Sequence, residues 1–258
     1  MHRLVAERST ELVIPGTAAD LYALWRHRSR VATKVVLNTD PCLELSRSKL
    51  ATARYFADQP FAIPTLHSCA YTECVARLGL PFILKPVSSD APERVTLIEN
   101  AVQFEYVTAR AGVGHYIYQR QVGSDDEEYT VAAFGDGHGG YVDSMLVRRR
   151  RAQDGNTARA WFVADDAAIR GTLDTVFRLV KPIGPTSLDL RKHDGVAYLL
   201  EINPRISSAC SIFTRMGYNE PEMCVRHLLW NEPVKPAVKC PGSVVRFLDD
   251  HFVEPDRG

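Results

Sequence analysis

One stretch of the sequence, LLEINPR at residues 199–205, carries most of the information about architecture and chemistry. Side chains of a strand alternate between its two faces, so Glu201 and Asn203 are expected on one face and the intervening apolar residues on the other. A carboxylate and an amide oxygen are hard ligands that suit Mg²⁺. Pro204 ends the strand because it has no N–H to donate to a ladder. Arg205 follows, where its guanidinium can neutralise phosphate oxygens.

A second carboxylate precedes this stretch, on a strand expected over residues 184–191. The turn between the two strands reads HDG at residues 193–195, and a three-residue turn pairs Asp189 with Leu199. Asp189 then lies diagonal to Glu201 on the same surface, about 7–8 Å away between backbones, where two carboxylates can share a metal ion. A two-residue turn would place Asp189 on the opposite face. The alternative is a charged hairpin at the protein surface.

A lysine, Lys85, ends the apolar run FIL at residues 82–84. A lysine held at a strand end against an apolar floor is suited to contacting phosphate. The alternative is a lysine whose stem covers apolar surface while its amine stays in water.

A strand expected over residues 115–122 is followed by the acidic run DDEE at 125–128 and by a further strand over 129–134. A strand that enters a turn offers backbone donors and acceptors to a planar base. An acidic residue at the start of the next strand can accept hydrogen bonds from ribose hydroxyls. The alternative is a solvated acidic hairpin.

Four consecutive arginines occupy residues 148–151, and Arg159 follows. Alternation sends two of the four to each face of a strand, so one pair can reach an anionic substrate or a transferring phosphoryl group. The alternative is an exposed basic loop. A nucleic-acid surface is not expected, because the chain has 31 basic and 31 acidic residues and no aromatic residues between these arginines. The glycine-rich residues 135–140 lie between two expected strands, which indicates a hairpin turn and not a phosphate-binding loop.

The composition is that of an ordinary globular protein, with 258 residues of which 45% are apolar and 24% charged. No apolar run approaches the ~18 residues of a membrane span, so no membrane partner is expected. The six cysteines form no CxxC pair, and the first residues lack an apolar secretory core. These features predict free thiols in a reducing cytoplasm.

Strands and helices alternate without a strict βαβ rhythm, which predicts an α+β or mixed α/β fold. Residues 1–40 are expected to form one short β–α–β unit, with strands over 11–15 and 35–37 and a helix capped by Asp20. Further helices are expected over residues 43–57, 71–78, 100–111, 165–180 and 221–230, and further strands over 82–84, 94–98, 115–122, 129–134 and 141–149.

Taken in order, these features resemble the ATP-grasp superfamily, particularly its carbamoyl-phosphate-synthase-like and amino-acid-ligase-like branches. The resemblance spans roughly residues 40–230. Its strongest part is YLLEINPR at residues 198–205, preceded by SLDLR at 187–191. The motifs LPFILKP at 80–86 and EYTV at 128–131 come earlier in the chain, in the order that the family shows.

The resemblance implies two α+β lobes that clasp ATP, preceded by a truncated α/β unit. It divides the chain into a remnant of an N-terminal domain at 1–40, a small lobe at 41–122 and a large lobe with the Mg²⁺ site at 123–258. The implied ATP contacts are Lys49 and Lys85 for the phosphates, Gln119, Arg120, Gln121 and Val122 for adenine, and Glu128 for ribose. The implied ligands of Mg²⁺, with Mn²⁺ as an alternative metal, are Asp189, Glu201 and Asn203. Arg205 and Arg150 match catalytic arginines near the transferred phosphate.

The activity that the resemblance implies is a ligase that uses ATP to activate a small-molecule carboxylate as an acyl phosphate, which an amine then attacks. Two departures favour an alternative, a non-catalytic or regulatory nucleotide-binding subunit with a degenerate site. The lid at residues 87–94 has no glycine, so Ser88, Ser89 and Arg94 are the available phosphate contacts. The N-terminal unit is short, which predicts a fragment, a misplaced start, or a homodimer or partner chain that completes the domain.

Overall fold

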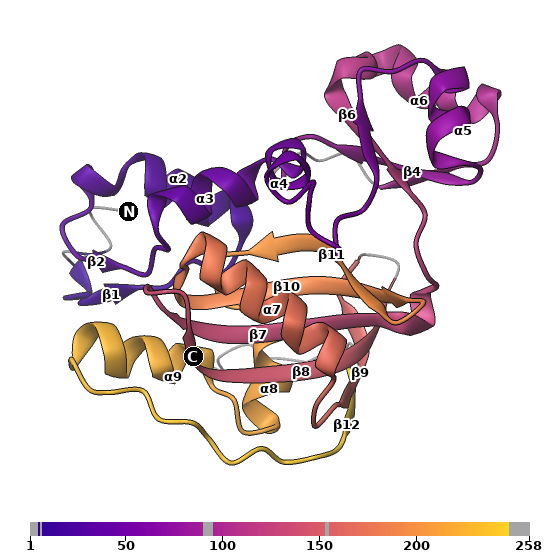
Figure 1. Cartoon of the computed structure of the whole chain (residues 1–258). Coiled ribbons are helices and arrows are strands. Elements are labelled where there is room, and N and C mark those ends of the chain that lie inside the picture. Colours follow the sequence, from indigo (N-terminus) through magenta and orange to yellow (C-terminus); the bar gives the residue numbers. More distant parts are fainter. Residues whose placement is uncertain (1–4, 6, 90–94, 153–154, 248–258) are drawn as a thin grey trace, which may run out of the picture.

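The computed structural model describes residues 5, 7–89, 95–152 and 155–247 (Figure 1). Their strands form three sheets, of six, four and two strands. The predicted mixture of helices and strands is confirmed, and the two larger sheets belong to different parts of the chain. Within the described residues, no helix has the length and apolar character needed to cross a membrane.

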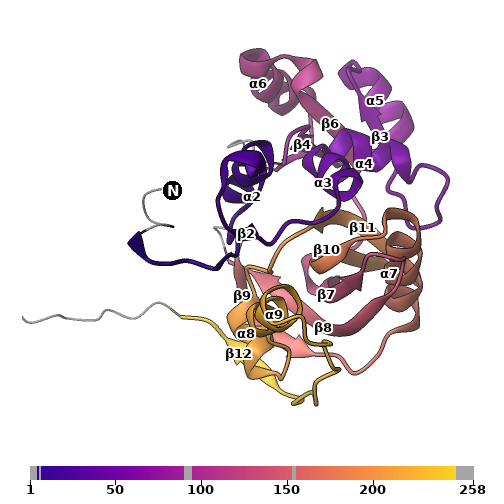
Figure 2. The same ribbon diagram turned by 90° about the vertical axis from the view of Figure 1, so that its left-hand side faces the viewer.

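The six-stranded sheet is antiparallel and has the order β11-β10-β7-β8-β9-β12. Figure 2 shows helix α7 on one face of this sheet and helices α8 and α9 on the other. The strands are β7 (Glu128–Asp136), β8 (Tyr141–Arg151), β9 (Thr157–Phe162), β10 (Ile183–His193), β11 (Val196–Asn203) and β12 (Ser243–Val245). The helices are α7 (Ala167–Val180), α8 (Cys210–Arg215) and α9 (Glu220–Cys224), and α9 continues as a π-helical turn, η4 (Val225–Leu229).

Helix α7 is amphipathic and covers the sheet through Leu173, Val176 and Phe177, all at most 2% exposed. Its predicted start is confirmed, because the Asp166 side chain accepts hydrogen bonds from the first turn. On the other face, Phe213 of α8 belongs to a second buried cluster. This second cluster covers only part of that face, and the polar side chains described below occupy the rest.

The four-stranded sheet has the order β3-β6-β4-β5 and carries helices α5 and α6. Its strands are β3 (Thr65–His67), β4 (Phe82–Pro86), β5 (Thr96–Ile98) and β6 (Tyr116–Arg120), and its helices are α5 (Tyr71–Leu78) and α6 (Ala101–Ala111). The helices expected over 71–78 and 100–111 are confirmed, with Gly79 ending α5 and Asn100 capping α6. Part of the strand expected over 94–98 lies outside the described residues. A 3-10 turn, η2 (Val113–His115), precedes β6.

The N-terminal strands β1 (Leu12–Val13) and β2 (Lys34–Val35) are parallel and flank helix α2 (Ala18–Arg26), so the predicted β–α–β unit is confirmed. A 3-10 turn, η1 (Arg28–Arg30), follows α2. The predicted cap was wrong by three residues, because Thr17 and not Asp20 caps the helix. The Asp20 carboxylate instead accepts a hydrogen bond from the Thr17 hydroxyl, at 2.7 Å.

The single helix expected over residues 43–57 is wrong, because two helices, α3 (Asp40–Arg47) and α4 (Lys49–Tyr55), occupy this region. Ser48 between them is extended and forms an isolated β-bridge with Ser88. This pairing with a segment 40 residues away overrides local helix propensity. As a consequence, a new helix starts at Lys49, beside the segment that follows β4.

The hairpin of β10 and β11 differs from the predicted register. Its turn has two residues, Asp194 and Gly195, both with positive φ (47° and 78°), so His193 pairs with Val196. An Asp-Gly pair favours this two-residue turn because both positions accept the left-handed conformation. Without a further change, Asp189 would therefore face the wrong side of the sheet.

A β-bulge at Leu200 supplies that change. Leu190 pairs with Leu199, whereas Asp189 pairs directly with Glu201, so Leu200 is the extra residue. Both carboxylates therefore lie on one face after all, as direct partners and not as the predicted diagonal pair.

Candidate functional site

A cleft of about 660 Å³ lies between the two larger sheets. The six-stranded sheet contributes β7, β8, β10 and β11 to its wall, and the opposite wall comes from α4, β4 and β6. Eight of the predicted site residues line this cleft: Lys49, Lys85, Gln119, Arg120, Val122, Glu128, Arg150 and Glu201. Residues that are up to 152 positions apart in the chain therefore meet at one site.

The bulge at Leu200 gives the cleft one wall that is both apolar and acidic. Because two consecutive residues of a bulge oppose one residue, Leu200 and Glu201 both line the cleft, while Leu199 and Ile202 belong to the core under α7. Leu200 offers an apolar floor for a planar ring, and Glu201 offers a carboxylate directly beside it. The sequence pattern of strict alternation did not predict this arrangement.

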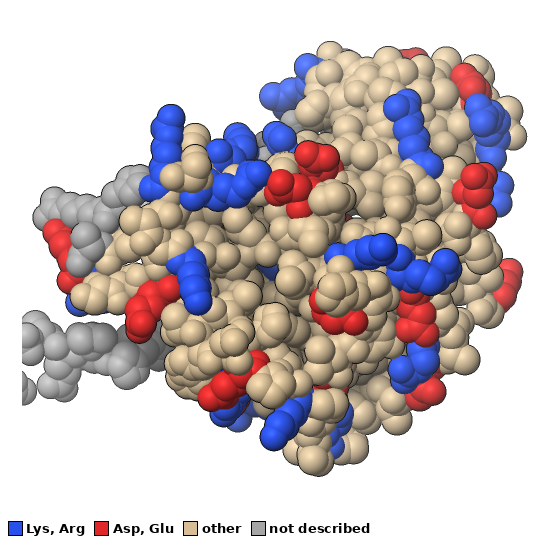
Figure 3. All heavy atoms as spheres, turned by 60° about the vertical axis from the view of Figure 1, so that its left-hand side comes forward, with Lys and Arg blue, Asp and Glu red and all other residues tan. Residues whose placement is uncertain are grey.

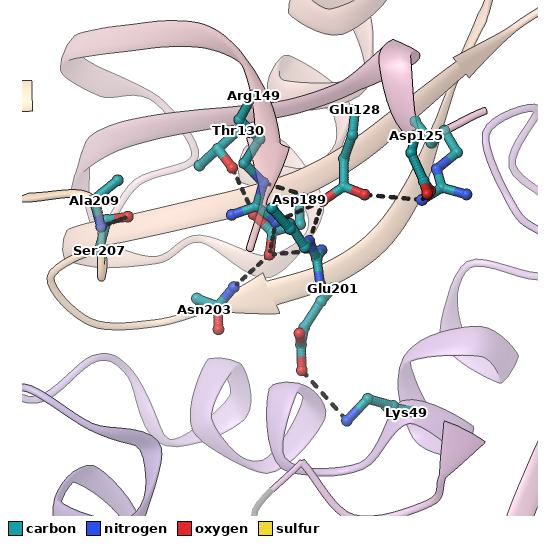
Figure 4. Close-up of polar contacts among 12 residues, drawn as sticks. Lys49, Asp125, Glu128, Thr130, Arg149, Asp189, Glu201, Asn203, Ser207 and Ala209 are labelled. Atoms are coloured by element: carbon teal, nitrogen blue, oxygen red, sulfur yellow. Dashed lines mark hydrogen bonds and ion pairs between the residues drawn. The ribbon is translucent and has the colours of Figure 1, made fainter. Parts of the chain in front are cut away.

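Lysines from the opposite wall face Glu201. The Lys49 amine lies 3.4 Å from a Glu201 carboxylate oxygen, and Figure 4 shows these two side chains approaching from opposite walls. Burial lowers the pKa of Lys85 to about 8, with Lys49 and Arg151 adding to the effect and Glu201 opposing it. A lysine that is this poorly hydrated and this crowded by other cations is stabilised by any anion that enters the cleft.

Behind Glu201, a buried network joins two carboxylates through Arg149. Arg149 is 5% exposed, and its Nη2 lies 2.9 Å from both the Glu128 and the Asp189 carboxylate (Figure 4). Asp189 also accepts a hydrogen bond from the Thr130 hydroxyl at 2.8 Å and from the Asn203 amide at 3.5 Å. Burial acts to raise the pKa of Asp189, but the Arg149 charge and its neighbours outweigh burial and hold that pKa below its ordinary value.

The Glu128 carboxylate is 3% exposed and is surrounded by guanidinium groups. Besides Arg149, it accepts from Arg151 and, at 2.9 Å, from Arg191. Arg191 also pairs with Asp125 at 2.8 Å. Burial would raise the pKa of Glu128, but these arginines lower it, so the side chain is an anion. Its predicted ribose contact therefore requires that a ribose hydroxyl replace or join one of these guanidinium donors.

The end of β6 has the properties that a planar base needs. Gln119 is 6% exposed, donates to the Thr65 hydroxyl at 2.9 Å, and keeps its buried carbonyl oxygen without a partner among the described residues. Beyond the strand, the backbone groups of Gln121 and Val122 make no hydrogen bonds within the part of the chain that the structure describes. The side chains Ile63 and Leu200 provide the apolar surface. Gln121 itself lines a neighbouring hollow.

The three predicted metal ligands differ in how far their oxygen atoms are already engaged within the protein. Among the described residues, no group of three or more acidic, histidine or cysteine side chains converges on one point. Both oxygens of Asp189 already accept hydrogen bonds or pair with a cation. Glu201 and Asn203 are partly exposed and retain oxygen atoms suited to Mg²⁺, so these two residues fit a metal that also binds phosphate.

Arg205 follows the metal-ligand strand and is held by a short loop. Its guanidinium donates to the Ile206 carbonyl at 2.8 Å. In the same loop, the backbone N–H of Ser207 donates to the Glu220 carboxylate at 2.8 Å. Glu220 is fully buried, and its second oxygen lacks a partner among the described residues. Burial raises the pKa of Glu220 to about 7, although the Ser207 N–H and the nearby Arg205 charge act to lower it.

We expect Glu220→Gln to remove part of the pH dependence of stability. Between pH 4.5 and 7 the folded protein keeps the Glu220 proton while the unfolded chain loses it, so the free energy of unfolding falls as pH rises. The wild type should lose roughly 2–3 kcal/mol across this window that the variant retains. Urea unfolding between pH 5 and 7.5 measures the difference, with the exposed Glu222→Gln as the control. Identical pH profiles for wild type and Glu220→Gln would refute the assignment.

The structure also contains site residues that sequence reasoning missed. Arg149, Arg151 and Arg191 form the cationic side of the network, and Asp125 lies at its edge. The sequence does signal Arg149 and Arg151, because alternation along residues 148–151 predicts that they share a face. The predicted phosphate contacts Ser88 and Ser89 lie beside α4, where the Lys49 amine lies 3.5 Å from the Ser89 hydroxyl. Arg94 lies outside the described residues.

Basic and acidic side chains are interspersed on the face shown in Figure 3, in line with the zero net charge. All six cysteines are free.

The fold matches that of several solved enzymes, two of them bound to ADP or MgADP. The chain superimposes on N5-carboxyaminoimidazole synthetase from Staphylococcus aureus complexed with ADP, at a TM-score of 0.71 and 11% identity, over 96% of this chain and 69% of the other. It also superimposes on the biotin carboxylase domain of 2-oxoglutarate carboxylase from Hydrogenobacter thermophilus in complex with MgADP (0.72, 12%, 93% and 59%) and on L-amino acid ligase from Bacillus licheniformis (0.65, 16%, 90% and 59%). The fold is therefore that of the ATP-grasp superfamily, as predicted.

A family model narrows this class. Residues 125–250 match the model described as ATP-grasp in the biosynthetic pathway with Ter operon. A search of curated proteins found no match. The chain spans between 59% and 69% of the length of the three solved structures named above.

Proposed function

We propose that this protein is an ATP- and Mg²⁺-dependent ligase that activates a small-molecule carboxylate for attack by an amine. The observation that carries the proposal is the meeting of Lys49, Lys85 and Glu201 at one end of a cleft whose other end offers unpaired acceptors and an apolar floor. A nucleoside triphosphate needs cations at one end of its site and an apolar, hydrogen-bonding surface at the other, because its phosphates carry several negative charges and its base is planar.

In the proposed reaction, a carboxylate oxygen of the substrate attacks the γ-phosphorus of ATP, and the bond to the β-phosphate oxygen breaks to leave ADP. An amine then attacks the acyl phosphate carbon, forms the amide bond and releases inorganic phosphate and a proton. Lys49 and Lys85 hold phosphate oxygens, and Arg205 offsets charge on the transferred group once it turns from the Ile206 carbonyl. When bound by Glu201 and Asn203, Mg²⁺ neutralises charge on the phosphates.

A second candidate function is nucleotide binding without turnover, as in a regulatory subunit. The pairing of Asp189 with Arg149 favours it, because a predicted metal ligand then serves as a counter-ion inside the protein. The lid residues 87–89 also lack glycine. The two candidates share the nucleotide cleft and differ only in whether ADP forms.

Glu201→Gln should abolish formation of an activated acid. Hydroxylamine converts an acyl phosphate into a hydroxamate and phosphate, so it traps the intermediate without knowledge of the natural amine. With ATP, Mg²⁺ and a panel of small carboxylic acids, the wild type should form hydroxamate and ADP in equal amounts. The variant should be slower by at least about 100-fold, and the exposed Glu105→Gln on α6 should match the wild type.

Two outcomes would contradict different parts of this proposal. Equal hydroxamate formation by Glu201→Gln and wild type would refute the role of Glu201. ATP binding by calorimetry without ADP or hydroxamate from any acid would support the second candidate.

A further inference from the structure

A second hollow, of about 430 Å³, lies beside the nucleotide cleft and is lined by arginines. Its lining residues are Asp126, Arg148, Arg150, Arg159 and Trp161, called here the arginine groove. They come from the neighbouring strands β8 and β9, shown side by side in Figure 1, and from the turn before β7. Arg150 and Asp126 also line the nucleotide cleft, so the two hollows share one wall.

The strand register forces three positive charges together. Arg148 pairs across the strands with Trp161, and Arg150 pairs directly with Arg159. The two pairs are two residues apart on each strand, so the four side chains are neighbours on a single face of the sheet. Like charges directly opposite each other destabilise a sheet, because their Cβ atoms lie only about 5 Å apart. Among the described residues, the groove nevertheless holds three guanidinium groups and one carboxylate.

The contacts within the groove leave most of this charge available. The single carboxylate, Asp126, pairs with Arg150. The Arg148 guanidinium lies over the Trp161 ring, 5.0 Å from its centre, a cation–π contact that favours this position. Arg159 is exposed and has no hydrogen-bond or ion-pair partner among the described residues.

We propose that the arginine groove binds a small, multiply charged anion bearing phosphate or carboxylate groups. Guanidinium groups bind both groups through paired N–H donors, and the hollow lies within the usual size range of small-molecule sites. An anion there relieves the repulsion between Arg150 and Arg159 that Asp126 alone does not neutralise. The site is distinct from the phosphate end of the nucleotide cleft, which contains Lys49 and Lys85.

Trp161 provides a local signal for the test. In a background with Trp25 and Trp230 replaced by phenylalanine, Trp161 is the only tryptophan of the chain. Titration with inorganic pyrophosphate and, separately, with citrate, without Mg²⁺ or nucleotide, should change its fluorescence saturably for at least one of them. Pyrophosphate alone points to a phosphorylated ligand, and citrate alone to a polycarboxylate. Arg159→Ala should weaken binding by about tenfold or more, whereas the exposed Arg110→Ala should stay within about twofold.

A second variant separates the two hollows. Pyrophosphate can also enter the nucleotide cleft, where Lys85→Met should weaken it but should leave the Trp161 signal and its midpoint unchanged. Because Arg159 is exposed, its replacement is not expected to unfold the protein, and circular dichroism checks this directly. A Trp161 signal that does not saturate, or that is the same in Arg159→Ala, would overturn the proposal. Loss of the signal in Lys85→Met would assign the anion to the nucleotide cleft instead.

Discussion

Replacing Arg149 by alanine is expected to lower the free energy of unfolding by about 3–5 kcal/mol. The substitution leaves the buried carboxylates of Glu128 and Asp189 without their shared cation, in a site where neither is more than 7% exposed. Urea unfolding at pH 7 measures the loss. Arg150→Ala is the matched control, because Arg150 is the next residue but is exposed and pairs with exposed Asp126, so its loss should stay below about 1 kcal/mol.

If Arg149→Ala does not fold, a double variant still tests whether the charges of the network stabilise one another. Arg149→Met combined with Asp189→Asn removes one cation and one anion together, so it should recover a large part of the lost stability. Equal stability of Arg149→Ala and Arg150→Ala would contradict the account of a buried network. So would a double variant that is no more stable than Arg149→Met alone.

Lys85→Met is expected to stabilise the free protein and to abolish nucleotide binding. Methionine keeps the apolar stem but lacks the charge, whose burial lowers the Lys85 pKa from 10.5 to about 8 and therefore costs up to about 3 kcal/mol at neutral pH. If the amine binds phosphate, ATP affinity should fall by at least about 100-fold in the variant. Thermal unfolding and calorimetry at pH 7 measure the two opposite effects.

The pH dependence of the free energy of unfolding also tests whether burial lowers the pKa of Lys85. Between pH 8 and 10.5 the unfolded chain holds the Lys85 proton that the folded protein has lost, so wild-type stability rises with pH relative to Lys85→Met. The stability difference between the two proteins should therefore shrink over this range. Lys181→Met, on the far end of α7, should show no such change. A destabilised Lys85→Met that still binds ATP would contradict both parts.

The sequence was sufficient to predict the ATP-grasp fold because each motif combines a local pattern with a chemical requirement. The apolar run before Lys85 predicts a strand end, and Glu201 with Asn203 predicts a face that carries oxygen ligands. Both predictions depend only on neighbouring residues. The Asn100 and Asp166 caps were predictable for the same reason, because a capping side chain acts within its own turn.

Register was not predictable from the same information. The turn at Asp194 and Gly195 and the bulge at Leu200 each shift the pairing by one residue in the same direction. Together they restore the predicted face of Asp189 but change its partner from Leu199 to Glu201. The expected face for Asp189 was therefore right although the expected turn was wrong. A bulge depends on packing against the core and on the neighbouring strand β10. The residues LLE at 199–201 contain no glycine or other local signal that would predict one.

The role of Arg149 was hidden for a related reason. Four adjacent arginines are chemically identical in the sequence, and alternation alone divides them into pairs without saying which pair shares a face with Glu128 and Asp189. The pairing of Tyr129 with Arg148 places Arg149 beside Glu128 on the face where Asp189 lies. This choice follows from contacts between residues at least 19 positions apart, as does the interruption of the helix at Ser48 by Ser88.

The most direct measurement is a crystal structure of the protein with Mg²⁺ and a non-hydrolysable ATP analogue. We predict that the base lies against Leu200 near Gln119, that the terminal phosphate lies between Lys49 and Lys85, and that Glu201 and Asn203 bind the metal ion. An analogue bound elsewhere, or a cleft that stays filled by the Lys49–Glu201 ion pair at saturating analogue, would contradict the account.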